Sequence, residues 1–238
     1  MSPSEDFEFA VDLAYNYGNL ALLDKDEKKA IELFTKALTS ERLRADAHIA
    51  LGDIYKRQDK LGKALEHYRE ARWIEPQNKN TLHNLGILEY LLGNENLAIM
   101  RVSDAVQCGK SDSFPFLCEI YSETQNPLAA LSIGDAYLQK GNSVEARKYW
   151  TMALVSKIPS VKTAAHFKIF LTTFLDGDIG NSIKLGQRAL QEGETDFVEY
   201  LQTLAHIQGT SSDDHNKKLR AKQVLEKLKI PLKKPDKP

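Results

Sequence analysis

The run DKDEKKAIELFT, from Asp24 to Thr35, begins with the alternating acidic residues of a calcium-binding loop. Such a loop needs oxygen ligands at regular intervals, a glycine at its sharp turn and a glutamate at its end. Here Lys28 and Lys29 replace a ligand and the glycine, and Thr35 replaces the glutamate. The run is therefore predicted to be the turn and cap before a helix.

The cysteines and histidines also lack the spacing that metal or thiol chemistry needs. Cys108 and Cys118 show no CxxC spacing, and two cysteines are too few for a disulfide framework, so we expect both to be small buried apolar side chains. The histidines show no metal-type spacing among themselves or with the cysteines, so we predict no metal site and no cofactor. The six histidines are His48, His67, His83, His166, His206 and His215.

Composition and motif content indicate a protein without catalytic machinery. Of the 238 residues, 42% are hydrophobic and 27% are charged, which is ordinary for a globular chain in water. The chain contains no GxGxxG, GxxxxGK[ST], GxSxG or HExxH motif. We therefore predict that the protein is not an enzyme.

The sequence shows no membrane or export signal. No run of about 18 apolar residues is present, which excludes a membrane-spanning helix. The N-terminus MSPSEDFEFAVDLAY is acidic and lacks the basic start and apolar core of a secretory signal. We expect a cytoplasmic location.

The charge is unevenly distributed along the chain. From Asn216 onward nine basic residues face two acidic ones, so this end carries +7 and the preceding residues carry −8. We expect the basic helix to be a cap, with lysines facing water and an apolar stripe of Leu219, Leu225 and Leu228. The alternative is that it docks on an acidic partner, nucleic acid or an anionic membrane. No aromatic residues interleave the lysines, which disfavours nucleic acid.

The elements that would position any functional side chain follow from an internal period of 34 residues. A small, a bulky and a second small residue recur at intervals of four and three, each after a pair that ends in glycine. Three copies are 34 residues apart, the fourth follows an insertion of about 14 residues, and a fifth is weaker. The four clear copies are Ala30, Phe34, Ala37; Ala64, Tyr68, Ala71; Ala98, Val102, Ala105; and Ala146, Trp150, Ala153.

Each copy predicts two amphipathic helices, because apolar residues recur every 3–4 positions on both sides of a short break. Gly93-Asn94 and Gly141-Asn142 each offer a left-handed glycine that ends one helix and a cap that starts the next. Asn126-Pro127 predicts a further helix start. No single pair can bury its apolar faces, so the pairs are expected to stack.

This pattern resembles that of the tetratricopeptide repeat family over roughly residues 11–196. The resemblance implies an all-α fold, an α-solenoid with a right-handed superhelix of about five to six helix-turn-helix units and a C-terminal capping helix. The expected repeats are 11–44, 45–78, 79–112, 127–160 and 163–196.

The same pattern gives an expected organisation for the whole chain. The insertion is predicted to form one extra helix, and the basic end to be disordered. The segments are 1–10, an N-terminal segment; 11–112, three repeats; 113–126, the inserted helix; 127–196, two repeats; 197–229, a degenerate helical pair and cap; and 230–238, the tail.

In repeats of this kind, the first helix of each pair lines a concave groove. Four asparagines fall on its inner positions, and an amide can both donate to and accept from a peptide backbone. Asp53 and Asp135 share the ninth position of their units. The predicted peptide-binding groove comprises Asn16, Asn19, Asp53, Lys56, Arg57, Asn80, His83, Asn84, Asp135 and Gln139.

One role of the family is disfavoured by the groove residues. The resemblance implies that a clamp for the C-terminal carboxylate of heat-shock proteins would need lysine and arginine at fixed positions. Those positions hold Tyr15, Asn19, Ala50, Asn80 and Asn84, so the cations are missing.

The leading hypothesis is a non-catalytic adaptor, co-chaperone-like in type, that binds a segment of a protein partner in the groove. The alternative is an assembly scaffold that self-associates or bridges subunits through its convex face or the 113–126 insertion. Nucleic-acid or anionic-surface binding through the basic end ranks third.

Overall fold

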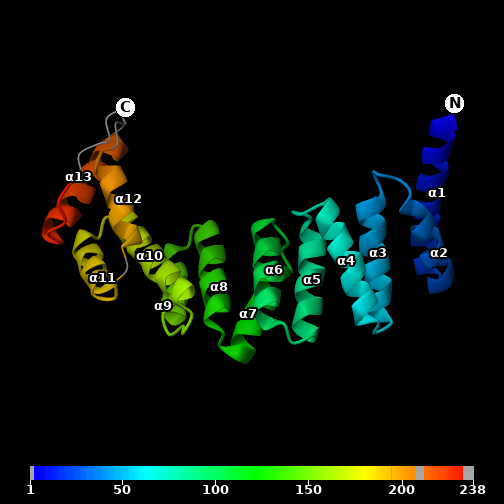
Figure 1. Cartoon of the computed structure of the whole chain (residues 1–238), viewed down its shortest axis with the longest axis horizontal. Coiled ribbons are helices and arrows are strands. Elements are labelled where there is room, and N and C mark those ends of the chain that lie inside the picture. The colour runs from blue at the N-terminus through cyan, green and yellow to red at the C-terminus, as the bar shows by residue number, and fades with distance from the viewer. Residues whose placement is uncertain (1–2, 194, 207–211, 233–238) are drawn as a thin grey trace. The chain divides into compact units, whose positions relative to one another are not determined.

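The computed structural model describes residues 3–193, 195–206 and 212–232, and the chain divides into two compact units at residues 120 and 121 (Figure 1). The division falls within helix α7, and each unit is described by itself below. Lys233, Lys234 and Lys237 of the predicted disordered tail lie outside the described residues.

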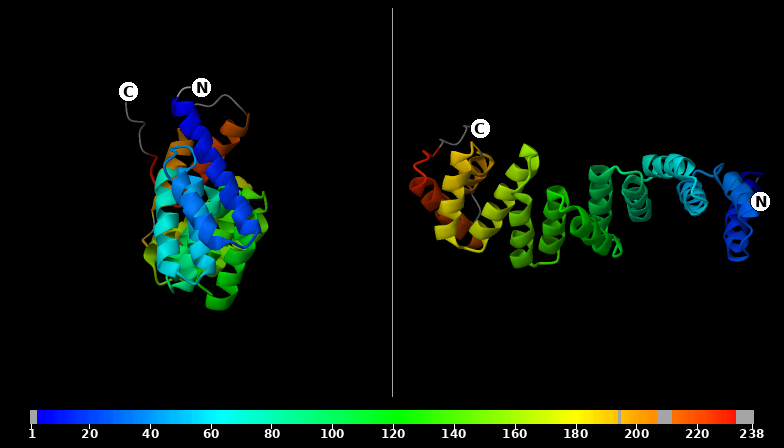
Figure 2. Two further views of the ribbon diagram at one scale, coloured as in Figure 1. Left: turned by 90° about the vertical axis from the view of Figure 1, so that its right-hand side faces the viewer. Right: turned by 90° about the horizontal axis from the view of Figure 1, so that it is seen from below.

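The first unit consists of helices that follow one another as antiparallel pairs (Figures 1 and 2). Within it α1 packs on α2, α3 on α4 and α5 on α6, and α2 and α4 also pack on the first helix of the next pair. Its helices are α1 (Pro3–Leu23), α2 (Glu27–Ala37), α3 (Arg44–Arg57), α4 (Leu61–Ile74), α5 (Lys79–Leu91), α6 (Glu95–Gln107) and the start of α7 (Ser113–Thr124).

The second unit repeats this scheme and ends on a basic helix, α13, which packs against α12 and α11. All the regular elements among the described residues are helices, and successive helices pack as pairs within each unit, so the fold is of the all-α solenoid class. The helices of this unit are α8 (Pro127–Gln139), α9 (Ser143–Ala153), α10 (Pro159–Leu175), α11 (Ile179–Gln191), α12 (Asp196–Ala205) and α13 (Ser212–Lys227).

The residues that recur in sequence form the core of each helix pair. The bulky member, such as Tyr68 or Trp150, is fully buried between two buried alanines. It lies against the glycine of the facing helix: a Cβ added to Gly52 would be 2.7 Å from Tyr68 Cε1, and one added to Gly134 would be 2.4 Å from Trp150 Cδ1. Glycine at these positions therefore lets the paired helices approach closely enough to enclose an aromatic ring.

The predicted helix boundaries are confirmed at three turns and wrong in one detail. Gly93 and Gly141 have φ of 79° and 78°, and the side chains of Asn126 and Asn142 cap α8 and α9. Asn94, however, forms no side-chain cap on α6 within the described chain. Its Nδ2 donates to Glu89 Oε2 at 2.6 Å, which turns the amide toward the preceding helix.

The run from Asp24 to Thr35 is a turn and helix start, as predicted. Asp26 caps α2 by accepting a hydrogen bond from the Lys29 backbone N–H at 3.1 Å. The prediction for the cysteines is wrong, since Cys108 is exposed and Cys118 is only partly buried. Cys108 follows the last turn of α6, beyond the part of the helix that packs on its neighbour.

The predicted apolar stripe of α13 is correct for Leu225 and wrong for Leu219. Leu225 is fully buried together with Ala221 and Val224, whereas Leu219 is 60% exposed. Val224 and Leu225 lie three and four residues after Ala221, so these three residues form the helix face that packs on α12 and α11, and Leu219 is left to solvent.

Helix α1 presents a second apolar face that the later pairs do not have. Leu13, Tyr17 and Leu20 are 42%, 51% and 51% exposed. The residues 34 positions later are Ala47, Leu51 and Ile54, which are nearly or fully buried against the preceding pair. The apolar face of α1 that corresponds to this stacking surface is therefore open to solvent in the structure.

Candidate peptide-binding face

Four side chains of the first unit form a continuous polar network across α3, α4 and α5. The Tyr68 hydroxyl donates to Asp53 Oδ1 at 2.5 Å, and Asn84 Nδ2 donates to the same oxygen at 2.9 Å. Lys56 Nζ in turn donates to Asn84 Oδ1 at 3.2 Å. Three of the predicted groove residues, Asp53, Lys56 and Asn84, are thus brought together.

The hydroxyl of the buried Tyr68 side chain anchors the network. Burial and then the neighbouring Asp53 carboxylate raise the pKa of the Tyr68 phenol, so its O–H stays protonated and keeps donating. The Lys56 ammonium lies 6.0 Å from the centre of the Tyr68 ring, and its bond to Asn84 uses one of its three donors. The network therefore holds a partly exposed ammonium in a defined place.

The predicted residues of α1 lie on the same side of their helix. Asn16 and Asn19 are both exposed, and Asn19 hydrogen-bonds the Tyr15 phenol. Burial and the negative charge of Asp46, on α3, raise the pKa of Tyr15, whereas the Asn19 bond lowers it. Tyr15 also packs against the buried cluster that contains Ala47 of α3, so the faces of α1 and α3 adjoin.

The two remaining predicted residues of α5 differ in their surroundings. Asn80 is exposed in the first helical turn, where its backbone N–H donates to Asn78. His83 is partly buried, with Nδ1 2.9 Å from Ser113 Oγ of α7. Burial and then Lys110 lower the pKa of His83, so the imidazole is neutral at pH 7.

Arg57 lies apart from the Lys56 network. Its Nε is 3.5 Å from Glu27 Oε1 of α2, and Gln58 Nε2 donates to the other oxygen of Glu27 at 2.8 Å. The arginine therefore ties the end of α3 to the start of α2.

The second unit repeats the arrangement around Asp53 with different residues. Asp135 accepts from Trp150 Nε1 at 3.0 Å and pairs with Lys168 Nζ at 2.9 Å. Trp150 stands in its repeat where Tyr68 stands, and Lys168 where Asn84 stands. Gln139, at the end of α8, is exposed.

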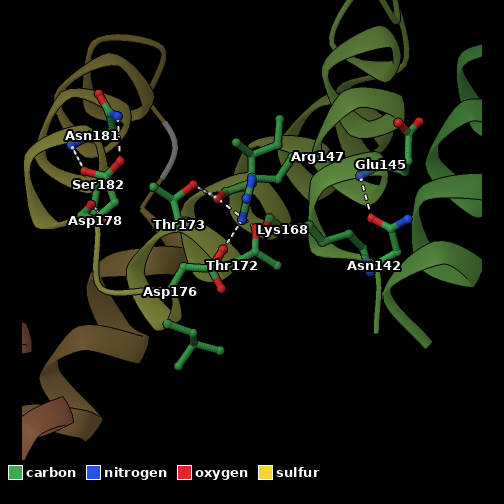
Figure 3. A network of polar contacts seen from close by, with 12 residues as sticks. Asn142, Glu145, Arg147, Lys168, Thr172, Thr173, Asp176, Asp178, Asn181 and Ser182 are labelled. Atoms are coloured by element: carbon green, nitrogen blue, oxygen red, sulfur yellow. Dashed lines mark hydrogen bonds and ion pairs between the residues drawn. The ribbon is translucent and has the colours of Figure 1, made fainter. Parts of the chain in front are cut away.

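Polar contacts hold the C-terminal half of α10, which carries Lys168 (Figure 3). Arg147 of α9 points toward Asp176, just after α10, and forms an ion pair with it. The Thr172 hydroxyl donates to the Lys168 carbonyl at 2.9 Å. The ion pair ties the end of α10 to α9, and the Thr172 bond lies within α10 itself.

Sequence reasoning missed the part that Tyr68, Trp150 and Lys168 play in the two networks. A signal was present: each ninth-position aspartate is followed 15 residues later by an aromatic side chain with a polar hydrogen. Residues at that spacing lie on the two helices of one pair. Each aspartate therefore accepts a hydrogen bond from the second helix of its own pair.

Within the described ranges, no group of three or more His, Cys, Asp or Glu side chains is placed to hold a metal ion. The helices of those ranges are also too short or too polar to cross a membrane.

Comparison with known proteins identifies the repeat. Residues 45–78, the second predicted unit, match the family model described as tetratricopeptide repeat. The chain contains a tetratricopeptide repeat at these residues. Proteins of this family are typically non-catalytic interaction modules. No curated protein matches the sequence.

Solved structures that resemble this chain do so at low identity. The MamA protein is 17% identical, with a TM-score of 0.39 over 78% of this chain and 92% of that one. PilF from Pseudomonas aeruginosa is 17% identical, with a TM-score of 0.40 over 94% and 93%. PilW, a type IV pilus biogenesis factor, is 18% identical, with a TM-score of 0.40 over 92% of each chain.

Proposed function

We propose that this protein is a non-catalytic adaptor that binds an extended segment of a partner protein on the face made by α1, α3 and α5. The observation that carries the proposal is the network of Lys56, Asn84, Asp53 and Tyr68, which holds an ammonium and an amide in fixed places on this face. Fixed donors cost a ligand less ordering entropy than mobile ones.

The chemistry of the face suits a peptide backbone. Lys56 has donors left for a carbonyl or carboxylate oxygen, and the exposed amides of Asn16 and Asn80 offer both donors and acceptors. The charge-assisted bond from Lys56 would be the strongest single contact. A terminal carboxylate clamp remains disfavoured, because it would need several cations. The cytoplasmic location stays a prediction.

Selection from a displayed library of random peptides tests the proposal and needs no identified partner. Peptides selected on the intact chain should lose about tenfold or more in affinity for Lys56→Ala, since a charge-assisted hydrogen bond is worth about 1.5–3 kcal/mol. The matched control is Lys63→Ala, an exposed lysine on α4. Equal loss in the two variants, or none in either, would contradict the proposal.

Assembly scaffolding is a second candidate, and the open apolar face of α1 favours it. Leu13, Tyr17 and Leu20 are exposed where later repeats bury the same positions, and exposed apolar patches mark interaction surfaces. Light scattering should then show a species larger than the monomer that Tyr17→Ser with Leu20→Gln dissociates. A monomer at all concentrations removes this candidate.

A further inference from the structure

A hollow on the other side of the first unit gathers three arginines. It lies between α4, α5 and α6, away from the residues of the proposed peptide-binding face. It is lined by Arg69, Arg72, Trp73, Pro76, Leu85, Glu89, Leu97 and Arg101.

The hollow exists because the third repeat departs from its neighbours at two paired positions. Tyr55 stacks on His67 with ring centres 5.4 Å apart, and Tyr137 stacks on Tyr149 with centres 5.5 Å apart. The third repeat has Glu89 and Arg101 at the positions of these stacked aromatic residues. A carboxylate and a guanidinium thus replace two stacked rings, and the space between the helices stays polar and open.

The positive charge in the hollow exceeds the negative charge. Glu89 is nearly buried and is engaged by Asn94 Nδ2 at 2.6 Å and by Arg69 at 3.6 Å. Arg101 lies 3.8 Å from Asp104 at the outer edge. Arg72 contributes a buried Nε that has no hydrogen-bond partner among the described residues. Three guanidiniums therefore face two carboxylates, which leaves an excess of positive charge for an anionic ligand.

The electrostatics of Arg101 agree with this imbalance. Burial and then the positive charge of Arg72 lower the pKa of Arg101. Two like charges held together in a partly buried place attract an anion, because the anion relieves both the repulsion and the lost hydration.

The rim of the hollow is apolar and exposed. Trp73 is 79% exposed and Leu97 is 42% exposed. Tryptophan and arginine are the residues most enriched at the energetic centres of protein interfaces. An exposed tryptophan beside three guanidiniums therefore points to a partner with both acidic and apolar groups.

We propose that this hollow, the arginine–tryptophan site, binds an acidic peptide segment of a partner protein. A carboxylate side chain of the segment would enter between Arg72 and Arg101, and a neighbouring apolar side chain would lie on Trp73 and Leu97. Arginine suits this role because its planar guanidinium can donate two parallel hydrogen bonds to one carboxylate. Glu89 and Asp104 interrupt the positive surface, which suits separate carboxylates better than the continuous phosphates of a nucleic acid.

The fluorescence of Trp73 reports binding directly, because the other tryptophan, Trp150, is fully buried. The intact chain is titrated with Ac-SEDLDEELS-amide, with its neutral counterpart Ac-SQNLNQQLS-amide, and with a short oligothymidylate. We expect a saturable change with the acidic peptide that weakens as salt rises. Trp73→Phe should abolish the change, and the neutral peptide should bind about tenfold more weakly or not at all.

Variants locate the site within the chain. Arg72→Gln with Arg101→Gln should lower affinity for the acidic peptide about tenfold or more, whereas Lys28→Gln with Lys29→Gln, two exposed cations on α2, should leave it unchanged. Equal binding of the acidic and neutral peptides, or no saturable change up to about 1 mM, overturns the proposal. Tighter binding of the oligothymidylate overturns it too. If the arginine variant does not fold, the comparison of the two peptides on the intact chain still decides.

Discussion

At the scale of single residues, each aspartate at the ninth repeat position has a structural as well as a surface role. Asp53 accepts from Tyr68 and Asn84, and Asp135 accepts from Trp150 and pairs with Lys168. The buried aromatic donor of each pair is satisfied by a carboxylate that also belongs to the predicted groove, so a packing contact fixes a side chain of the proposed binding face. A substitution at Asp53 would therefore disturb both.

Glycine substitutions test the close approach of paired helices. Gly52→Ala should destabilise the protein by about 1–3 kcal/mol, because the new methyl group would overlap the Tyr68 ring. Gly62→Ala is the control: no described atom lies within 4 Å of a Cβ there, and alanine favours the helix by about 0.5–1 kcal/mol. Urea unfolding of both variants measures the two changes. Similar free energies of unfolding for the two would refute the steric explanation.

The histidine pair of α3 and α4 predicts a pH dependence of stability. His48 and His67 have their Nδ1 atoms 2.9 Å apart, and burial lowers the pKa of both. Glu70 opposes the shift at His48, and Glu66 and Glu70 oppose it at His67. The unfolded chain then binds more protons, so the stabilisation is present above the unfolded pKa of about 6.5 and is lost as pH falls through the folded values.

This pH dependence can be measured by urea unfolding between about pH 7.5 and 5. The free energy of unfolding should fall with pH more steeply for the natural chain than for His48→Gln with His67→Gln. His215→Gln, at an exposed position, serves as the control and should leave the pH dependence of the free energy of unfolding unchanged. The same slope for all three proteins would show that the pair does not titrate as described.

At the scale of elements, two repeat positions have opposite surroundings in different helices. Leu51 and Ile54 of α3 are buried against the preceding pair, whereas Tyr17 and Leu20 of α1 are about half exposed. The same repeat positions thus hold core residues in α3 and surface residues in α1.

Matched substitutions test this difference. Ile54→Ala should cost about 2–5 kcal/mol of unfolding free energy, since it removes buried side-chain volume. Leu20→Ala, at the equivalent position of α1, should change stability by less than about 1 kcal/mol. Both are read from denaturant midpoints at dilute protein concentration. A large loss for Leu20→Ala would show that another part of the chain covers α1.

Sequence alone predicted the helices better than the partners of polar side chains. The burial of Phe34, Tyr68 and Trp150 follows from the 34-residue period, because packing repeats wherever the spacing repeats. The bonds of Asp53 to Asn84 and of Asp135 to Lys168 join different repeats, so no local pattern specifies them. The arginine–tryptophan site escaped notice for the same reason, since Arg69 and Arg101 belong to neighbouring units.

At the scale of the whole molecule, the repeated residues account for the architecture, and the proposed binding surfaces lie mainly on residues between them. The small and bulky residues of the period build the stacked pairs, and the positions between them vary. In the first unit those variable positions produce two distinct polar surfaces, one on α1, α3 and α5 and one between α4, α5 and α6. An adaptor with two such surfaces could hold two partner segments at once, which raises their effective concentration.

Site-specific photocrosslinking tests the central claim most directly, because it maps where a selected peptide lies. A benzophenone amino acid is placed at Asn80, on the proposed face, or at Lys36, on α2, both exposed positions. The account predicts crosslinks to the selected peptide from Asn80, suppressed by excess unlabelled peptide, and none from Lys36. Crosslinks from Lys36 alone, or equally from both positions, would contradict it.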